Sequence, residues 1–147
     1  MTIQDIVALA RAEADKHGFA GVPIQIDQSK CRMGGCAHRG DTILYFTFSA
    51  VLMPLVSNAE ILDTILHEIA HAKTPGAKHG LAWQVAAIAV GAKPQPCSAA
   101  VIDAKQAGYK YIAACACGPH VHGKCRRPTR RVICSTCHQP LTYVQQY

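Results

Sequence analysis

Residues 57–73 read SNAEILDTILHEIAHAK, and this stretch is the most informative part of the chain about its fold and its chemistry. Ser57, with Glu60 three residues later, has the form of a capping box and predicts the start of a helix. Apolar residues then recur at helical spacing: Ile61, Leu62, Ile65, Leu66, Ile69 and Ala70. Pro75-Gly76 is expected to end the helix. The stretch therefore predicts an amphipathic helix that packs one face against a core.

The same helix carries a histidine pair with a glutamate between the two. His67 and His71 are four residues apart, so they lie on one face of the helix, one turn from each other. Both imidazoles can then bind one Zn²⁺ at about 2.0–2.1 Å, and Glu68 lies where it can take a proton from a water on the metal. A chance histidine pair on the surface is the alternative. The capping signal and the periodicity favour a zinc hydrolase, with a peptidase as the first expectation.

A catalytic zinc usually has three protein ligands and one open position. Glu68 is the last glutamate of the chain, so no later glutamate can be the third ligand. His79 is preferred, because a short loop with a Pro-Gly turn brings it back toward the metal at a low entropic cost. Asp103 is the main alternative, and the other candidates are His120, His122 and His138.

The rest of the chain predicts both helices and strands, and hence an α+β fold. Half of the 147 residues are hydrophobic, which suffices for one domain with a small appendage. Residues 30–40 contain three glycines and predict a loop or an irregular hairpin end. Helices are expected over residues 3–17 and 81–90, and short strands over residues 22–27, 42–48, 109–115, 129–134 and 141–145.

Charge is distributed unevenly and indicates a domain boundary near residue 104. Residues 1–104 contain eight Lys or Arg and all nine acidic residues, whereas residues 105–147 contain seven Lys or Arg and no acidic residue. The formal net charge of +6 therefore comes from the C-terminal part. A basic segment without acids predicts a polyanionic partner, nucleic acid first, and a solvated surface that only aids solubility is the alternative.

Composition also bears on the compartment and on the eight cysteines. No apolar run approaches the roughly 20 residues of a membrane span, and residues 1–16 lack the basic start and apolar stretch of a signal peptide. We therefore expect a cytoplasmic protein without membrane association, whose cysteines are thiols or metal ligands and not disulfides. Cys31 and Cys36 are interpreted as free thiols in a loop, although with His38 they could instead form a metal site or a redox pair.

Two close cysteine pairs lie in the basic segment: Cys115-x-Cys117 and Cys134-x-x-Cys137. Each pair can present two thiolates from a tight turn, and four thiolates can enclose one structural Zn²⁺ in a tetrahedron. A small three-stranded module buries little apolar area, so bound metal would supply part of its folding free energy. The first pair has one intervening residue, not two, which leaves three alternatives for a ligand: Cys125, His120 and His122.

Basic residues crowd the segment between the cysteine pairs: Lys124, Arg126, Arg127, Arg130 and Arg131. Tyr109, Tyr111 and Tyr143 are close to them in the sequence. Cations that bind phosphates and aromatic rings that stack on bases together predict a surface for single-stranded nucleic acid. Packing within strands is the alternative role for each tyrosine.

Two motifs resemble the SprT-like metallopeptidase family, which includes the Spartan DNA–protein crosslink proteases. They are His67-Glu68-x-x-His71 and, after a turn, His79-Gly80-x-x-Trp83. Metzincins fit less well, because they have a Gly three residues and a His six residues after the second His. The resemblance implies that His67, His71 and His79 hold a catalytic Zn²⁺ and that Glu68 is the catalytic residue. Tyr45 and His38 are candidates for a second group that stabilises the transition state.

The cysteine segment resembles the zinc ribbon that ends many SprT-like proteins, so the resemblance covers roughly residues 40–147. It implies an α+β fold with a zincin-like protease domain over residues 1–104 and a zinc ribbon over residues 105–147. The activity it implies is that of a zinc metalloendopeptidase, recruited or activated by DNA, single-stranded DNA favoured, with DNA-bound or crosslinked proteins as substrates. Two alternatives remain: a nucleic-acid-binding zinc protein without catalysis, and a zinc amidase or peptidase that acts independently of DNA.

Overall fold

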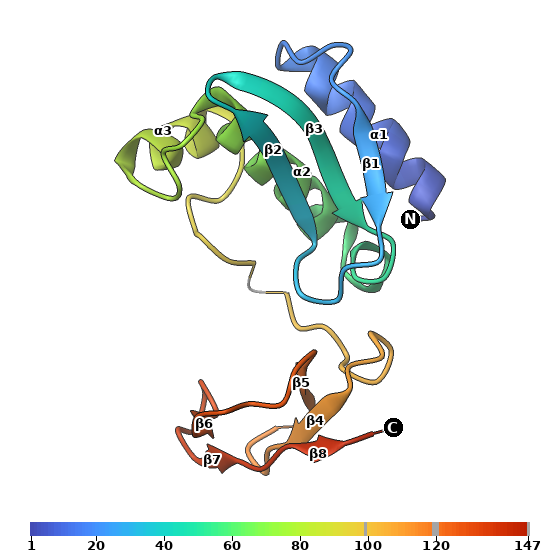
Figure 1. Ribbon diagram of the computed structural model, residues 1–147, viewed down its shortest axis with the longest axis vertical. Coiled ribbons are helices and arrows are strands. Elements are labelled where there is room, and N and C mark those ends of the chain that lie inside the picture. The colour runs from blue at the N-terminus through green and yellow to red at the C-terminus, as the bar shows by residue number, and fades with distance from the viewer. Residues whose placement is uncertain (99, 119–120, 147) are drawn as a thin grey trace. The chain divides into compact units, whose positions relative to one another are not determined.

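The computed structural model describes residues 1–98, 100–118 and 121–146, which form two compact units. The first unit spans Met1–Ala100 and the second Val101–Tyr147, a division close to the expected change at residue 104. The first unit contains three helices and a three-stranded sheet, and the second contains short strands (Figure 1). The α+β class expected from the sequence is confirmed.

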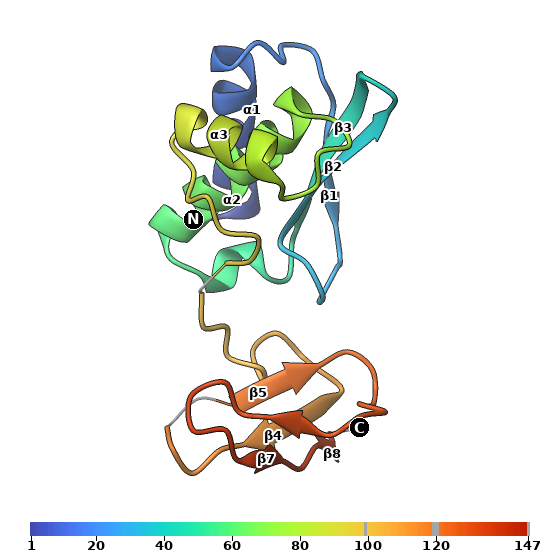
Figure 2. The same ribbon diagram turned by 90° about the vertical axis from the view of Figure 1, so that its left-hand side faces the viewer.

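In the first unit the helices lie on one side of the sheet (Figure 2). Fully buried apolar side chains from the three helices, β3 and the 3₁₀ turn form the core between these layers: Ile6, Phe46, Phe48, Met53, Ile61, Ile65, Ile69 and Trp83. The elements of this unit, in chain order, are α1 Ile3–Lys16, β1 Ile24–Asp27, β2 Gly34–Arg39, β3 Thr42–Ser49, the 3₁₀ turn Met53–Leu55, α2 Asn58–Lys73 and α3 Leu81–Val90.

The sheet has the strand order β1-β3-β2, so both β1 and β2 lie at its edges. β1 pairs with β3 in parallel, and β2 pairs with β3 antiparallel, with a register shift between Ala37 and His38. Residues 34–39 are therefore a strand and not a loop, and the alternative expectation for residues 30–40, an irregular hairpin end, agrees with the antiparallel pairing and its register shift. Two glycines give this strand a low intrinsic preference for extended structure, and pairing with β3 overrides that preference.

The start of α2 differs in one detail from the predicted capping box. Ser57 Oγ accepts a hydrogen bond from Glu60 N at 3.2 Å, as a helix N-cap does. The Glu60 carboxylate instead accepts hydrogen bonds from Lys93 Nζ and Ser98 Oγ, both at 2.8 Å. Glu60 therefore links the first turn of α2 to the segment that follows α3.

The second unit consists of short strands around a small core. β4 Tyr111–Ala114 lies between β5 Val121–Lys124 and β8 Val144–Gln145, and β6 Val132–Ile133 pairs with β7 Pro140–Leu141. The sequence did not predict β5, whose residues include His, Gly and Lys, and pairing with β4 is what makes it a strand. Few side chains are buried here, and most of these are small: Ala104, Ala107, Ile112, Ala113, Cys115 and Cys134.

Gly123 in β5 is needed for a close approach within this unit. A Cβ atom at this position would lie only 2.0 Å from Cδ2 of Tyr109, because the tyrosine ring packs directly on the glycine backbone. Any side chain at position 123 would therefore displace the ring. Tyr109 thus packs on β5, which is the alternative to a role in base stacking.

In the described part of the chain, none of the helices combines the length and the apolar character that a membrane span requires.

Candidate metal centres

Three histidines converge in the first unit. His67 and His71 come from α2, and His79 comes from the turn between α2 and α3. Nε2 of His79 lies 3.2 Å from Nε2 of His67 and 3.1 Å from Nε2 of His71. A tetrahedral Zn²⁺ with Zn–N bonds of about 2.0–2.1 Å separates its nitrogen ligands by roughly 3.3 Å. The three residues could therefore hold one metal ion without rearrangement.

The turn after α2 brings His79 back to the helix. Thr74 ends α2, with its Oγ1 donating to the Ala70 carbonyl at 2.9 Å. Gly76 then adopts a positive φ of 80°, which glycine tolerates without strain. Gly80 follows His79 directly and is the N-cap of α3. Among the described residues, the group that could bind metal contains His79 and does not contain Asp103, His122 or His138.

The electrostatics of the site favour neutral imidazoles. Burial lowers the pKa of His67 to about 4, and the neighbouring His79 acts in the same direction. Burial also lowers the pKa of His71 to about 4, together with the effect of the imidazoles of His67, His79 and His38. A histidine must be neutral to coordinate a metal, so each of these two rings has one unprotonated nitrogen available for a metal at neutral pH.

Trp83, in the first turn of α3, lies against all three histidines. Its ring centroid is 4.7 Å from that of His67, 5.3 Å from that of His71 and 4.6 Å from that of His79. The side chain is fully buried. Sequence reasoning missed its contact with the histidines. The four-residue spacing from His79, on the first turn of a helix, is the signal that could have revealed it.

Glu68 is almost completely buried beside β2, with only 7% of its surface exposed. A Cβ atom on Gly34 would lie 2.9 Å from Glu68 Cγ and 3.0 Å from Glu68 Oε1, so glycine lets the strand approach the carboxylate. Burial raises the pKa of Glu68 to about 7, against the opposing effect of the Arg32 guanidinium. A carboxyl group with a pKa near neutrality is suited to both accepting and donating a proton at pH 7.

Two other predicted residues lie on the sheet. His38 is exposed on β2, and its Nδ1 lies 2.9 Å from the Gly40 carbonyl. Tyr45 on β3 is half-buried and pairs with Ala37. His38 is close enough to contribute to the lowered pKa of His71. Among the described residues, no group that could bind a metal includes Cys31, Cys36 or His38. Cys36 lies in strand β2 and not in the loop expected for it.

Four cysteine sulfurs converge in the second unit. Sγ of Cys115 lies 3.2 Å from Sγ of Cys117 and 3.3 Å from Sγ of Cys137, and Sγ of Cys117 lies 3.6 Å from Sγ of Cys134. Zn–S bonds of about 2.3 Å separate tetrahedral sulfur ligands by roughly 3.8 Å, whereas a disulfide bond is only about 2.05 Å long. The four thiols are free and could hold one metal ion.

The alternative ligands of the second unit do not join this group. Among the described residues, Cys125 and His122 are outside the cluster, and His120 lies outside the described residues. Backbone N–H groups of Cys137 and Thr136 lower the pKa of Cys134, with Thr136 N lying 3.4 Å from its sulfur. Backbone donors directed at a sulfur are typical of cysteine turns that present thiolates to a metal.

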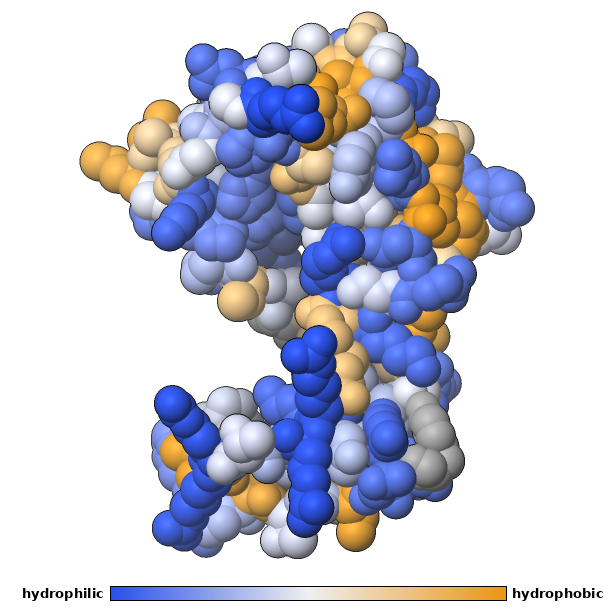
Figure 3. Space-filling view, viewed as in Figure 1, coloured by the Kyte–Doolittle hydropathy of each residue, from blue (hydrophilic) through white to orange (hydrophobic). Residues whose placement is uncertain are grey.

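The five basic residues between the cysteine pairs are exposed: Lys124, Arg126, Arg127, Arg130 and Arg131. None of them takes part in an ion pair within the parts of the chain that the structure describes. Lys124 stands opposite Tyr111 in the β4–β5 register, and Lys110 Nζ lies 5.8 Å from the centre of the Tyr111 ring. Figure 3 shows strongly hydrophilic side chains projecting from this unit.

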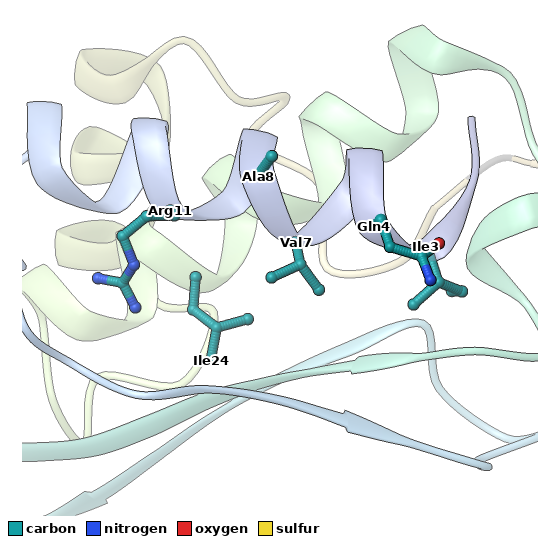
Figure 4. A pocket seen from close by; sticks show the side chains of 6 residues that line it. All are labelled: Ile3, Gln4, Val7, Ala8, Arg11 and Ile24. Atoms are coloured by element: carbon teal, nitrogen blue, oxygen red, sulfur yellow. The ribbon is translucent and has the colours of Figure 1, made fainter.

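An apolar hollow of about 480 Å³ lies between α1 and β1 (Figure 4). Arg11 is the charged residue of its lining, and it already pairs with Asp15 and donates to the Val22 carbonyl. The hollow therefore offers no side chain suited to chemistry, and none of its lining residues belongs to either metal centre: Ile3, Gln4, Val7, Ala8, Arg11 and Ile24.

Comparison with known proteins gave no match: no protein-family model fits the chain, and no curated protein or solved structure is significantly similar to it.

Proposed function

We propose that the first unit is a zincin-like, zinc-dependent endopeptidase. The observation that carries the proposal is the convergence of three imidazoles, with Nε2 separations of 3.1 and 3.2 Å, beside the helix that also buries Glu68. A Zn²⁺ ion held by His67, His71 and His79 would polarise a peptide carbonyl and lower the pKa of a water to near 7. Glu68 would serve as the group that accepts a proton from the attacking water and returns it to the leaving amine.

The edge of the sheet supports a polypeptide substrate. β2 is an edge strand, and its outer row of main-chain N–H and C=O groups has no strand partner among the described residues. An extended chain can add to such an edge as a further strand. Gly34 holds β2 against Glu68, so a peptide paired with β2 would present its carbonyls close to the carboxylate. An enzyme for small amides would have no need of such an edge.

We further propose that the second unit is a zinc ribbon that binds single-stranded DNA and brings the peptidase to DNA-bound or crosslinked proteins. Cys115, Cys117, Cys134 and Cys137 would hold its structural Zn²⁺. The exposed lysine and arginine side chains between the two cysteine pairs support a phosphate-binding surface, because no acidic residue follows Asp103.

A casein cleavage assay, with and without single-stranded DNA, tests the proposal. Cleavage that DNA stimulates and that a chelator abolishes is expected, together with two zinc ions per chain. Glu68→Gln should reduce the rate by roughly 10²–10⁴-fold and leave the zinc content unchanged, because the carboxylate moves protons and does not bind metal. DNA binding without cleavage would indicate a nucleic-acid-binding zinc protein, and cleavage that ignores DNA would indicate an independent zinc amidase or peptidase.

A further inference from the structure

Trp83 is the only tryptophan of the chain, and its ring contacts all three histidines of the candidate centre. The histidines come from two different segments, α2 and the turn after it, so neither segment alone determines how their rings are oriented. Trp83 is fully buried in α3 and lies within 4.6 to 5.3 Å of each ring, measured between centroids. One side chain, Trp83, thus contacts all three imidazole rings and restricts their orientations together.

The contacts differ in geometry in a way that restricts each ring. The indole is tilted by 30° relative to the His71 ring and lies at 86° to the His79 ring, an edge-to-face contact. It is tilted by 60° relative to His67. Edge-to-face contacts are favourable for aromatic rings. Rotation of any one imidazole would replace such a contact with a clash or a gap.

We propose that Trp83 is a positioning residue that holds His67, His71 and His79 with their Nε2 atoms converging before a metal binds. This inference rests on the histidines being metal ligands, as the proposed function requires. Groups that orient metal ligands commonly change metal affinity 10- to 100-fold when they are replaced. Preorganised ligands lose less conformational freedom when the metal binds, so the contacts of Trp83 should raise the affinity for the metal.

The indole nitrogen supports a role beyond filling space. Trp83 Nε1 is buried and has no hydrogen-bond partner among the described residues. A buried donor without a partner opposes folding, and a phenylalanine would fill part of the same space without that cost. The contacts of the larger indole with three imidazoles offset the free-energy cost of burying this unpaired N–H group.

Metal affinity tests the inference independently of peptide cleavage. The full chain is prepared with Zn²⁺ in the cysteine site and with the histidine site emptied by a mild chelator, and Co²⁺ is then titrated. Trp83→Leu should weaken Co²⁺ binding at the histidine site 10- to 100-fold, and Trp83→Phe by less than tenfold. Phe46→Leu, which removes another fully buried ring of the same core, should leave the affinity unchanged. Circular dichroism establishes that each variant is folded.

The wild-type chain provides a second measurement that needs no variant at position 83. Its single tryptophan lies beside the histidines, so Co²⁺ bound there should quench the intrinsic fluorescence with one-to-one saturation, and His79→Ala should abolish that quenching. Unchanged emission while the Co²⁺ d–d bands saturate would contradict the placement of Trp83.

Outcomes for Trp83 and for the proposed function are distinguishable. Equal affinity in Trp83→Leu and the wild type, or an equal loss in Phe46→Leu, would overturn the positioning role even if the protein cleaves peptides. Metal binding at the histidines that Trp83→Leu weakens, without any peptide cleavage, would support Trp83 and reject the peptidase. A histidine site that binds no metal would overturn both.

Discussion

Gly34 determines how closely β2 can approach Glu68, the proposed catalytic residue. A methyl group at this position would lie 2.9 Å from Glu68 Cγ and 3.1 Å from Thr64 Cγ2. Both neighbours belong to α2 and are buried, so neither can move away freely. We expect Gly34→Ala to shift Glu68 or the strand, to lower stability by about 1–3 kcal/mol, and to reduce kcat by tenfold or more at unchanged zinc content.

Gly35→Ala is the control for this prediction. A Cβ atom there would meet Thr47 Cγ2 at 3.1 Å and the Arg32 guanidinium at 2.9 Å, and Glu68 is not among its three nearest atoms. This variant should lose stability with a smaller effect on kcat. Full activity in Gly34→Ala would show that the close approach does not matter for catalysis.

Cys36 tests the strand β2 itself. Burial raises the pKa of Cys36 to about 12, and the charge of Glu68 acts in the same direction. Cys36 is therefore a thiol and not a thiolate at pH 8. Cys31 and Cys97, in contrast, are exposed to solvent. Iodoacetamide should label Cys31 and Cys97 well before Cys36, as measured by mass spectrometry of tryptic peptides. Labelling at equal rates would indicate that residues 34–39 form a loop.

At the level of helices and strands, Glu60 links α2 to the chain after α3. Hydrogen bonds from Lys93 and Ser98 lower the pKa of Glu60, so the folded protein holds this proton less tightly than the unfolded chain. The stabilisation is therefore present above the unfolded value near 4.5 and is lost as the pH falls below it. Because Lys93 is exposed, the effect is modest.

Thermal unfolding of Glu60→Gln measures this contribution. The variant should melt at a lower temperature than the wild type at pH 7, and the difference should shrink toward pH 3.5 as the wild-type carboxylate becomes protonated. A difference of the same size at both pH values would mean that the carboxylate charge has no part in the link.

Some helices and strands can be predicted from their local sequence, whereas others form only because they pair with a neighbouring strand. The capping serine, the apolar periodicity and the Pro-Gly stop together predict α2, and the HExxH spacing places His67 and His71 on one of its faces. β2 and β5 contain glycines and polar residues and become strands only through their neighbours β3 and β4. Gly34 beside Glu68 is a tertiary contact that no spacing rule reveals, whereas the spacing of Trp83 from His79 could have indicated only one of its three histidine contacts.

At the level of the whole molecule, the two units differ in charge and should differ in how they bind DNA. Replacing Arg126, Arg127, Arg130 and Arg131 with alanine should weaken binding to single-stranded DNA and flatten its salt dependence. If each arginine contacts one phosphate, the slope of log K against log salt should fall by about 3, at roughly 0.7 per contact. Affinity measured at several salt concentrations gives this slope.

A matched control removes the same charge from the first unit. Replacing Lys16, Lys30, Arg39 and Lys78 with alanine changes the net charge equally and leaves the second unit intact. This variant should retain nearly the whole salt slope. Equal losses in the two variants would mean that DNA responds to net charge alone, without a dedicated surface.

The two candidate centres use different donor atoms, nitrogen in one unit and sulfur in the other. Peroxide converts thiolates to sulfenic acids and disulfides under conditions that leave imidazole intact. If the cysteines hold zinc as proposed, oxidative stress would eject that ion and unfold the second unit, while the histidines kept theirs. The proposed hydrolase would then continue to work without the proposed DNA-binding unit, and reducing agents together with Zn²⁺ would restore DNA binding.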